Sequence, residues 1–253
     1  MTESQDSVYS KKNSLGIGCL IIAVPLIVIC LFLMHPKVRG AREAARRSMC
    51  KNNLKNIGIA LHQYHGVYDC FPPAYIADNK GQPLYSWRVL LLPYLDQEKL
   101  YQQFNLDEPW DSPQNKELLE KIPTVFRCPT HGAVSENDSE ICTHYSAVFG
   151  EGCIFEGANS ISIQDITDGT SQTVAVLEVS DAVIPWSAPV DIHRTKHLKL
   201  GDRNGYSSDH QGGLHALFAD GSIHFLNTTY KKLDTEMTRQ LMLRNDGEKI
   251  EDF

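Results

Sequence analysis

Apolar residues recur at helical spacing in the first third of the chain. Cys50, Leu54, Ile57, Leu61, Tyr64 and Tyr68 follow one another at steps of three or four residues. This spacing places their side chains on one face of a helix, and Phe71-Pro72-Pro73 ends it. The pattern predicts a helix over residues 37–68 with an apolar face that needs a packing partner.

Beyond about residue 141 the apolar positions alternate with a period of two. Segments rich in β-branched residues predict strands over residues 144–150 and 173–179. The clearest hairpin joins residues 214–219 to 222–227 through Asp220-Gly221, a dipeptide that favours tight turns. The whole region 141–228 is therefore expected to be β-rich.

Shorter helices and loops are expected between and after these regions. The segment 71–130 combines apolar runs with prolines and predicts short helices over residues 96–104 and 114–121, the second capped by Ser112. A C-terminal helix is expected over residues 234–244. A long helix covered by an antiparallel sheet predicts an α+β architecture.

Near the N-terminus, residues 15–34 form a run of twenty uncharged positions. As a helix this run would be about 30 Å long, which matches the hydrocarbon core of a bilayer. It predicts a transmembrane helix, preceded by a disordered polar segment (1–14) and followed by one domain (35–253). A cleaved signal peptide is the alternative, but the run is too long and lacks a small-x-small cleavage site.

Charge is unevenly distributed along the chain. The formal net charge is −7, yet residues 37–55 carry seven basic side chains and only one acidic one. The acidic remainder argues against nucleic acid as a partner. The basic cluster favours a cytoplasmic domain under the positive-inside rule. This conflicts with the export that the number of cysteines suggests, as the next paragraph describes.

Of seven cysteines, five lie outside the apolar run: Cys50, Cys70, Cys128, Cys142 and Cys153. An odd number of this kind suggests two bridges and a spare thiol in an exported domain. The alternative is a metal site built from Cys128-Pro-Thr-His131 and Cys142-Thr-His144, although zinc sites usually show tighter repeated pairs.

For the other polar residues and the tryptophans, we expect structural roles in preference to functional ones. Glu178 ends an apolar strand and is expected to point outward; an inward carboxylate would need a partner. The remaining candidates are loop or surface histidines, an acidic loop without the regular spacing of a calcium site, and two tryptophan anchors: His193, His197, His62, His65, Asp107, Glu108, Asp111, Trp110 and Trp186.

Several sequence blocks occur together in a recognisable order. They include AREAARRSMCKNNLKNIGIALHQYH (41–65), SWRVLLLPYLDQEKLYQQF (86–104), FRCP (126–129) and VIPWSAPVDI (183–192). Near the C-terminus, His210 is followed after nine residues by Asp220-Gly221. With these blocks the chain resembles a large bacterial family of unknown function that has a prepilin-like N-terminal helix and a box of this form.

The resemblance implies a pilin-like fold, with a long transmembrane-plus-amphipathic helix packed on an antiparallel sheet and the domain exported from the cytoplasmic membrane. It also implies a disulfide between Cys50 and Cys128; a second, between Cys142 and Cys153, would link neighbouring strands. The chain lacks the family's processing signal, having Ser14-Leu15-Gly16 there and no acidic residue nearby. We therefore expect it to remain uncleaved.

The box residues are expected to be structural, with Asp220 and Gly221 in the hairpin turn and His210 capping a loop. A functional reading would make His210 a ligand or proton shuttle.

The favoured function is a non-enzymatic structural or interaction protein of the bacterial envelope, without metal or cofactor, whose partners are the bilayer and other pilin-like proteins. The alternatives are an exported polysaccharide- or peptide-binding module with a pocket lined by Trp110 and Trp186, and a metal-dependent hydrolase using His193, His197 and His210.

Overall fold

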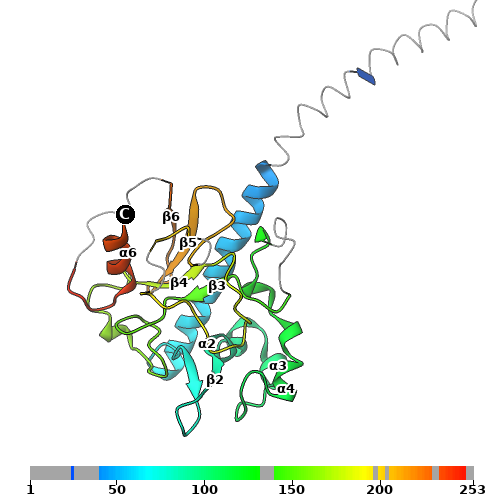
Figure 1. The fold of residues 1–253 in the computed structure, drawn as a ribbon, viewed down its shortest axis with the longest axis vertical. Helices are drawn as coiled ribbons and strands as arrows, with labels where there is room; N and C mark the ends of the chain where they lie inside the picture. Colours follow the sequence, from blue (N-terminus) through cyan, green and yellow to red (C-terminus); the bar gives the residue numbers. More distant parts are fainter. Residues whose placement is uncertain are drawn as a thin grey trace, which may run out of the picture. The chain divides into compact units, whose positions relative to one another are not determined.

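The computed structural model describes residues 24–25, 40–131, 140–195, 199–202, 205–229 and 234–248. By its internal contacts the chain divides into two units, residues 1–45 and 46–253. The helix over residues 40–68 begins in the first unit and continues into the second, which contains every strand that the structure describes. Figure 1 shows this helix in blue.

Four strands form an antiparallel sheet in the simple order β3-β4-β5-β6. They are β3 (Tyr145–Ala147), β4 (Val174–Glu178), β5 (Gly213–Phe218) and β6 (Ile223–Asn227). The predicted hairpin is observed as β5 and β6. In its turn Gly221 has φ +80° and Asp220 Oδ1 accepts the backbone N–H of Ser222 at 2.8 Å, as a tight turn requires.

Each face of this sheet packs against a helix. Leu54, Ile57 and Leu61 of the long helix share a core cluster with Leu217 of β5. The neighbouring β5 residues Leu214 and Phe218 belong to a second cluster with Leu241 and Met242 of α6 (Thr235–Met242). The alternation along β5 follows from the period of two in a strand. All residues of β3, β4 and β5 are buried, whereas β6 is partly exposed. Figure 1 shows the long helix and α6 beside the sheet.

Close packing of helix and sheet explains one residue that costs helix stability. A Cβ atom at Gly58 would lie 2.8 Å from Leu217 Cδ1, which is too close for an unstrained contact. Glycine lowers helix propensity by about 1 kcal/mol, and here it lets the helix backbone approach β5.

Residues 71–126 contain a two-stranded antiparallel sheet of β1 (Tyr75–Ala77) and β2 (Pro83–Ser86) and several short helices. The helices are α2 (Trp87–Leu90), η1 (Leu92–Leu95), α3 (Glu98–Tyr101), α4 (Pro113–Lys116), η2 (Leu119–Lys121) and η3 (Thr124–Phe126). A further turn, η4 (Ile163–Asp165), precedes β4. Ser112 caps α4, as the sequence predicts, by accepting the backbone N–H of Asn115.

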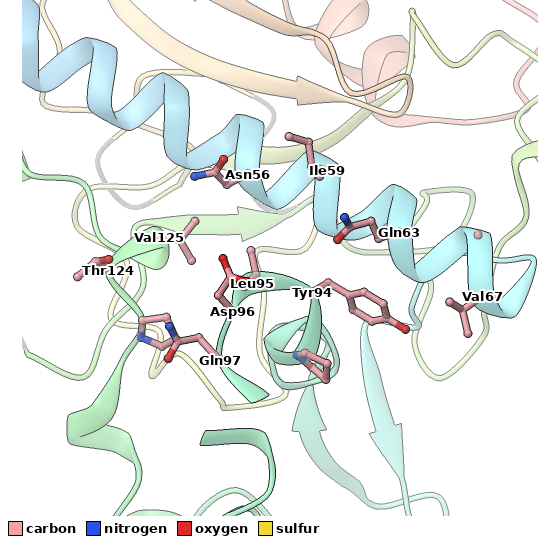
Figure 2. Close-up of a pocket in the computed structure, with 13 residues that line it drawn as sticks. Asn56, Ile59, Gln63, Val67, Tyr94, Leu95, Asp96, Gln97, Thr124 and Val125 are labelled. Carbon is pink, nitrogen blue, oxygen red and sulfur yellow. The ribbon is translucent and has the colours of Figure 1, made fainter. Parts of the chain in front are cut away.

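The face of the long helix that turns away from the sheet borders a groove. Side chains of the helix form one wall, and those of η1 and η3 form the other (Figure 2).

The pilin-like fold class is corrected by this structure. The α+β class holds, but among the described residues no helix is both long and apolar enough to cross a bilayer. The helix that packs on the sheet carries charged side chains along its length, including Arg42, Glu43, Lys51 and Lys55. The predicted span 15–34 lies outside the described residues except for 24–25, as does the segment 1–14.

With that fold class, the predicted single-pass location in the cytoplasmic membrane, with the domain exported, is corrected too. It depended on a spanning helix, and none is found among the described residues.

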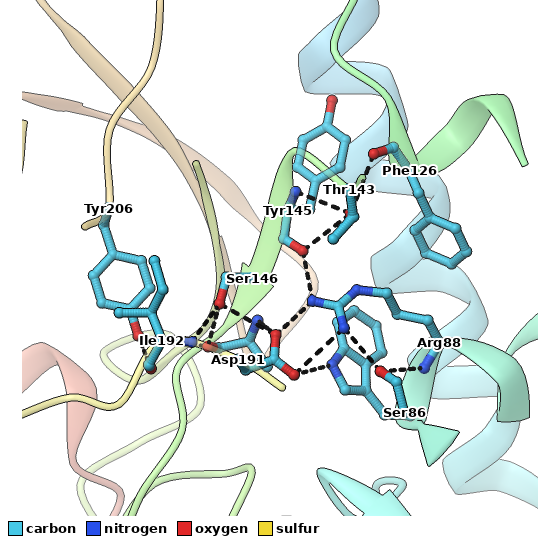
Figure 3. A network of polar contacts seen from close by, with 11 residues as sticks. Ser86, Arg88, Phe126, Thr143, Tyr145, Ser146, Asp191, Ile192 and Tyr206 are labelled. Atoms are coloured by element: carbon cyan, nitrogen blue, oxygen red, sulfur yellow. Dashed lines mark hydrogen bonds and ion pairs between the residues drawn. The ribbon is translucent and has the colours of Figure 1, made fainter. Parts of the chain in front are cut away.

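A buried ion pair joins the helical region to the sheet (Figure 3). Arg88 of α2 and Asp191 have side chains 0% and 2% exposed, with Nη2 and Oδ1 2.5 Å apart. Arg88 Nη2 also donates to the carbonyl of Tyr145 at 2.8 Å. The Asp191 carboxylate accepts the backbone N–H of Ala147 at 2.8 Å and the indole N–H of Trp87 at 3.0 Å.

We expect Arg88→Met and Asp191→Asn each to lower the free energy of unfolding by about 3–5 kcal/mol, because each leaves a charge buried without its partner. The double variant should lose less than the sum of the two. Urea unfolding measures all three.

Arg239→Gln, which removes the partly exposed pairs with Glu236 and Asp246, is the control and should leave the midpoint of urea unfolding nearly unchanged. If the loss in the double variant equalled the sum of the two single losses, an energetic coupling between Arg88 and Asp191 would be contradicted.

Candidate functional site

Two features are candidates for a functional site: a buried cluster of sulfur, carboxyl and imidazole groups, and the groove beside the long helix. The cluster lies between the helix and the sheet and is formed by Cys50, Cys128, Glu178 and His210. Their potential ligand atoms all lie within 4.8 Å of one another.

Cys50 and Cys128 are joined in a disulfide, the pair that the family resemblance implies. Cys50 sits on the packing face of the helix and Cys128 follows η3, with Cα atoms 5.3 Å apart and a sequence separation of 78. The bond therefore ties the helix to the end of the helical region.

The predicted bridge between Cys142 and Cys153 is wrong, because neither residue forms a disulfide in the described structure. Both are buried. Burial raises the pKa of the Cys153 thiol to about 12, so this group stays protonated and unreactive at neutral pH.

Glu178 points into the protein, so its predicted outward orientation is wrong. The residue is 2% exposed because both faces of β4 are covered, a situation in which strand polarity no longer alternates. Its Oε1 lies 3.5 Å from His210 Nε2 and 3.1 Å from His215 Nδ1. The backbone N–H of His215 donates to Oε2 at 2.8 Å.

These partners determine the ionisation of Glu178. Burial alone would raise the pKa of the carboxyl group, but hydrogen bonds and charge from His210 and His215 outweigh it and lower the pKa to about 2. The carboxylate thus stays charged inside the protein, held by two imidazoles.

Further histidines surround the disulfide. His144 Nδ1 accepts the backbone N–H of Cys128 at 2.9 Å, and the His131 and His144 rings lie 4.4 Å apart. His131 Nδ1 is 2.6 Å from Asp209 Oδ2. The segments Cys128-Pro-Thr-His131 and Cys142-Thr-His144, considered as a metal site, thus contribute Cys128 to the cluster and place His131 and His144 beside it.

The two parts of the predicted box do not meet. His210 precedes β5 and Asp220 follows it, so they lie at opposite ends of that strand. His210 is 3% exposed and Nε2 lies 3.8 Å from Cys128 Sγ. Asp220 and Gly221 form the hairpin turn, where the carbonyl of Gly221 accepts a hydrogen bond from Lys55 Nζ at 3.2 Å.

Other candidates occupy separate places. His193 pairs with Thr195, their Nδ1 and Oγ1 2.8 Å apart, and His197 lies outside the described residues. His62 and His65 pack on Phe71.

The tryptophans and the acidic loop are structural. Trp186 is fully buried and donates to the carbonyl of Leu119 at 3.0 Å. Trp110 packs partly buried against the core, and neither tryptophan lines the groove. The acidic loop of Asp107, Glu108 and Asp111 is held by the buried amide of Asn115, which donates to the carbonyls of Asn105, Glu108 and Pro109.

The groove has a volume of about 880 Å³. Figure 2 shows Asn56, Ile59 and Gln63 along the helix, with Tyr94 of η1 facing them. The lining consists of Asn56, Ile59, Gln63, Gly66, Val67, Pro93, Tyr94, Leu95, Asp96, Gln97, Pro123, Thr124 and Val125. It contains one charged residue, Asp96, and no histidine, cysteine, lysine or arginine among the described residues.

Sequence reasoning missed the groove and the inward role of Glu178 and His215. A signal for Glu178 was present, since TVAVLEV is apolar at nearly every position, as in a strand covered on both faces. Groove residues such as Gln63 and Tyr94 carry no such signal, because nothing in a polar helix face indicates which chain segment lies opposite.

Reducing the Cys50–Cys128 bond should lower the free energy of unfolding by about 4 kcal/mol, because a loop of 78 residues gains freedom in the unfolded chain. Chemical denaturation with and without a reductant measures this. A C50A/C128A variant is the control and should not respond to the reductant; an equal response would contradict the assignment.

Stability should also depend on Glu178 in acid. The unfolded carboxyl takes up a proton near its ordinary pKa of 4.5, whereas the folded one remains ionised to about pH 2. Its contribution, about 3 kcal/mol, is therefore complete above pH 4.5 and disappears as the pH falls towards 2.

In the Glu178→Gln variant the free energy of unfolding should change less with pH between about 2 and 4.5 than in the wild type. Glu117→Gln, which replaces an exposed carboxylate, is the control and should behave like the wild type. Parallel wild-type and E178Q curves would disprove the depressed pKa.

Comparison with known proteins identifies a family. The family described as "Protein of unknown function (DUF1559)" matches residues 39–196. No curated protein and no solved structure matches the chain. Because residues 39–196 are more than half of its 253 residues, the chain belongs to the DUF1559 family of proteins of unknown function.

Proposed function

We propose that this protein is a non-enzymatic binding protein whose groove beside the long helix holds a neutral, hydroxyl-rich ligand such as an oligosaccharide. The observation that carries the proposal is the lining of the groove, where primary amides surround a tyrosine and basic side chains are missing among the described residues. This develops the binding-module alternative, but with Tyr94 in place of the two tryptophans.

The size of the groove supports a small ligand or a few units of a chain. Its volume of about 880 Å³ lies in the range of ligand sites, roughly 300–1,000 Å³. Asn56, Gln63 and Gln97 each offer both a donor and an acceptor, which suits hydroxyl groups. The ring of Tyr94 offers an apolar face with a polar edge.

The charge of the lining disfavours other ligands. Asp96 repels anions, and within the described structure no lysine or arginine lines the groove to bind phosphate. The described lining also lacks the nucleophile–base pair on which covalent catalysis depends. These features support binding without chemistry.

Peptide recognition fits less well. Adding a peptide strand needs an open sheet edge, and docking a helix needs an apolar groove. The groove here lies between helices and is lined by mixed polar and apolar residues, so we favour the saccharide.

The family box has a structural role in this proposal. His210 at one end of β5 holds Glu178, and the Asp220-Gly221 turn at the other end contacts Lys55 of the long helix. The second contact joins the helix to the hairpin and so supports one wall of the groove.

Binding to a broad array of neutral and acidic glycans tests the proposal. We expect a neutral glycan to bind, and Tyr94→Ala and Gln63→Ala each to weaken its affinity at least about tenfold, since each removes a stacking or hydrogen-bonding group. Calorimetry on the best glycan measures the change.

Gln114→Ala, a surface glutamine outside the groove, is the matched control and should bind like the wild type. Absence of any glycan binding that depends on Tyr94, or equal loss in Q114A, would overturn the proposal.

A further inference from the structure

The cluster of Cys50, Cys128, Glu178 and His210 contains two sulfurs, one nitrogen and one oxygen at one buried point. The four residues are 0%, 7%, 2% and 3% exposed. They come from the long helix, the segment after η3, the end of β4 and the approach to β5. Apolar packing alone does not explain why four separate segments bring these donor atoms together.

The distances among these donors resemble those around a tetrahedral ion. Zinc binds imidazole nitrogen and carboxylate oxygen at about 2.1 Å and thiolate sulfur at about 2.3 Å, which places neighbouring donors about 3.4–3.6 Å apart. Glu178 Oε1 and His210 Nε2 are 3.5 Å apart. Cys128 Sγ and His210 Nε2 are 3.8 Å apart.

The sulfur–sulfur separation is the part of the geometry that must change. In a tetrahedral site two thiolates lie about 3.8 Å apart, whereas here Cys50 and Cys128 are covalently bonded. A disulfide sulfur is not a thiolate, and the thiolate is the form that binds metals. Breaking the Cys50–Cys128 bond would therefore provide the two thiolates that the ligand set lacks.

Groups outside the cluster hold the other donors in position. His215 contacts Oε1 through its ring and Oε2 through its backbone N–H, which fixes the carboxylate. His144 accepts the backbone N–H of Cys128. Supporting contacts of this kind orient metal ligands, and none of these contacts involves a sulfur atom.

We propose that reduction of the Cys50–Cys128 disulfide converts this cluster into a zinc site with Cys50, Cys128, His210 and Glu178 as its four ligands. Two thiolates with an imidazole and a carboxylate favour Zn²⁺ over Mg²⁺ or Ca²⁺. Four protein ligands leave no open position, so the bound ion is structural. The same segments are then joined by a covalent bond when oxidised and by a metal when reduced.

A dithiol can reduce the Cys50–Cys128 bond by thiol–disulfide exchange. The dithiol gives up two electrons and becomes a disulfide, while the Cys50–Cys128 bond breaks and each sulfur takes a proton. Zn²⁺ then displaces the two thiol protons to solvent and keeps its oxidation state. Of the two cysteines, Cys128 is the more exposed, at 7% against 0% for Cys50, and it lines a small hollow together with His131, Glu178 and Asp209.

Metal content of the full chain tests the proposal. The chain is treated with Zn²⁺ with or without a phosphine reductant, which takes oxygen from water to become a phosphine oxide, and is then freed of unbound metal. We expect one zinc per reduced chain and none on the oxidised chain. Reduced chain with Co²⁺ should show the absorption bands of tetrahedral cobalt bound to thiolate.

Variants distinguish this site from the other thiols and histidines. His210→Ala and Glu178→Gln should weaken zinc binding at least about tenfold, and C50S/C128S should abolish it. Cys70→Ser and His193→Ala remove a thiol and an imidazole outside the cluster and should bind zinc like the wild type. If the reduced chain unfolds, circular dichroism should show that Zn²⁺ restores its fold, but not that of C50S/C128S.

Equal zinc content in oxidised and reduced chains would overturn the proposal. So would zinc binding that survives in C50S/C128S, or that is lost equally in C70S and H210A. None of these outcomes depends on the groove, so the proposed binding function is tested separately.

Discussion

The buried pair of Arg88 and Asp191 joins α2 to the four-stranded sheet, and the packing of residues 71–126 on that sheet depends on it. It sits against β3, which is one of the two edge strands of the four-stranded sheet. The backbone N–H of Val148 bonds inward to β4, whereas the carbonyl of Tyr145 and the N–H of Ala147 are bonded by Arg88 and Asp191. The ion pair thus satisfies an open sheet edge, which would otherwise be a place for another chain to pair.

This arrangement explains why two charged side chains are buried at such cost. Desolvating an ion pair is expensive unless further hydrogen bonds complete it, and here the backbone of β3 and the indole of Trp87 supply them. The pair therefore replaces a neighbouring strand. It also positions α2 and the following η1, which carries Tyr94 and leads to Asp96 at the groove.

A second buried charge is Glu178 of β4, which pairs in register with Tyr145 of β3, the residue whose carbonyl accepts a hydrogen bond from Arg88. Its imidazole partners and the adjacent disulfide connect β4, β5 and the long helix. The sheet is thus held to its surroundings by polar centres as well as by apolar packing. Removing one partner from either centre leaves an unsatisfied group in a dry interior.

The sequence by itself determined the local elements of this protein. The helical period from Cys50 to Leu61 and the Asp220-Gly221 turn are properties of neighbouring residues, and the structure has both. The tertiary structure alone decided which distant groups meet: Arg88 with Asp191, Glu178 with two histidines, and Gln63 with Tyr94 across the groove. A backbone pattern reports which face of an element is apolar, whereas the partner of a buried charge depends on how separate segments pack. The prediction that Glu178 faces water is wrong for the same reason: the apolar run of β4 is typical of a strand covered on both faces, but only the packing of distant segments brings two imidazoles to the carboxylate.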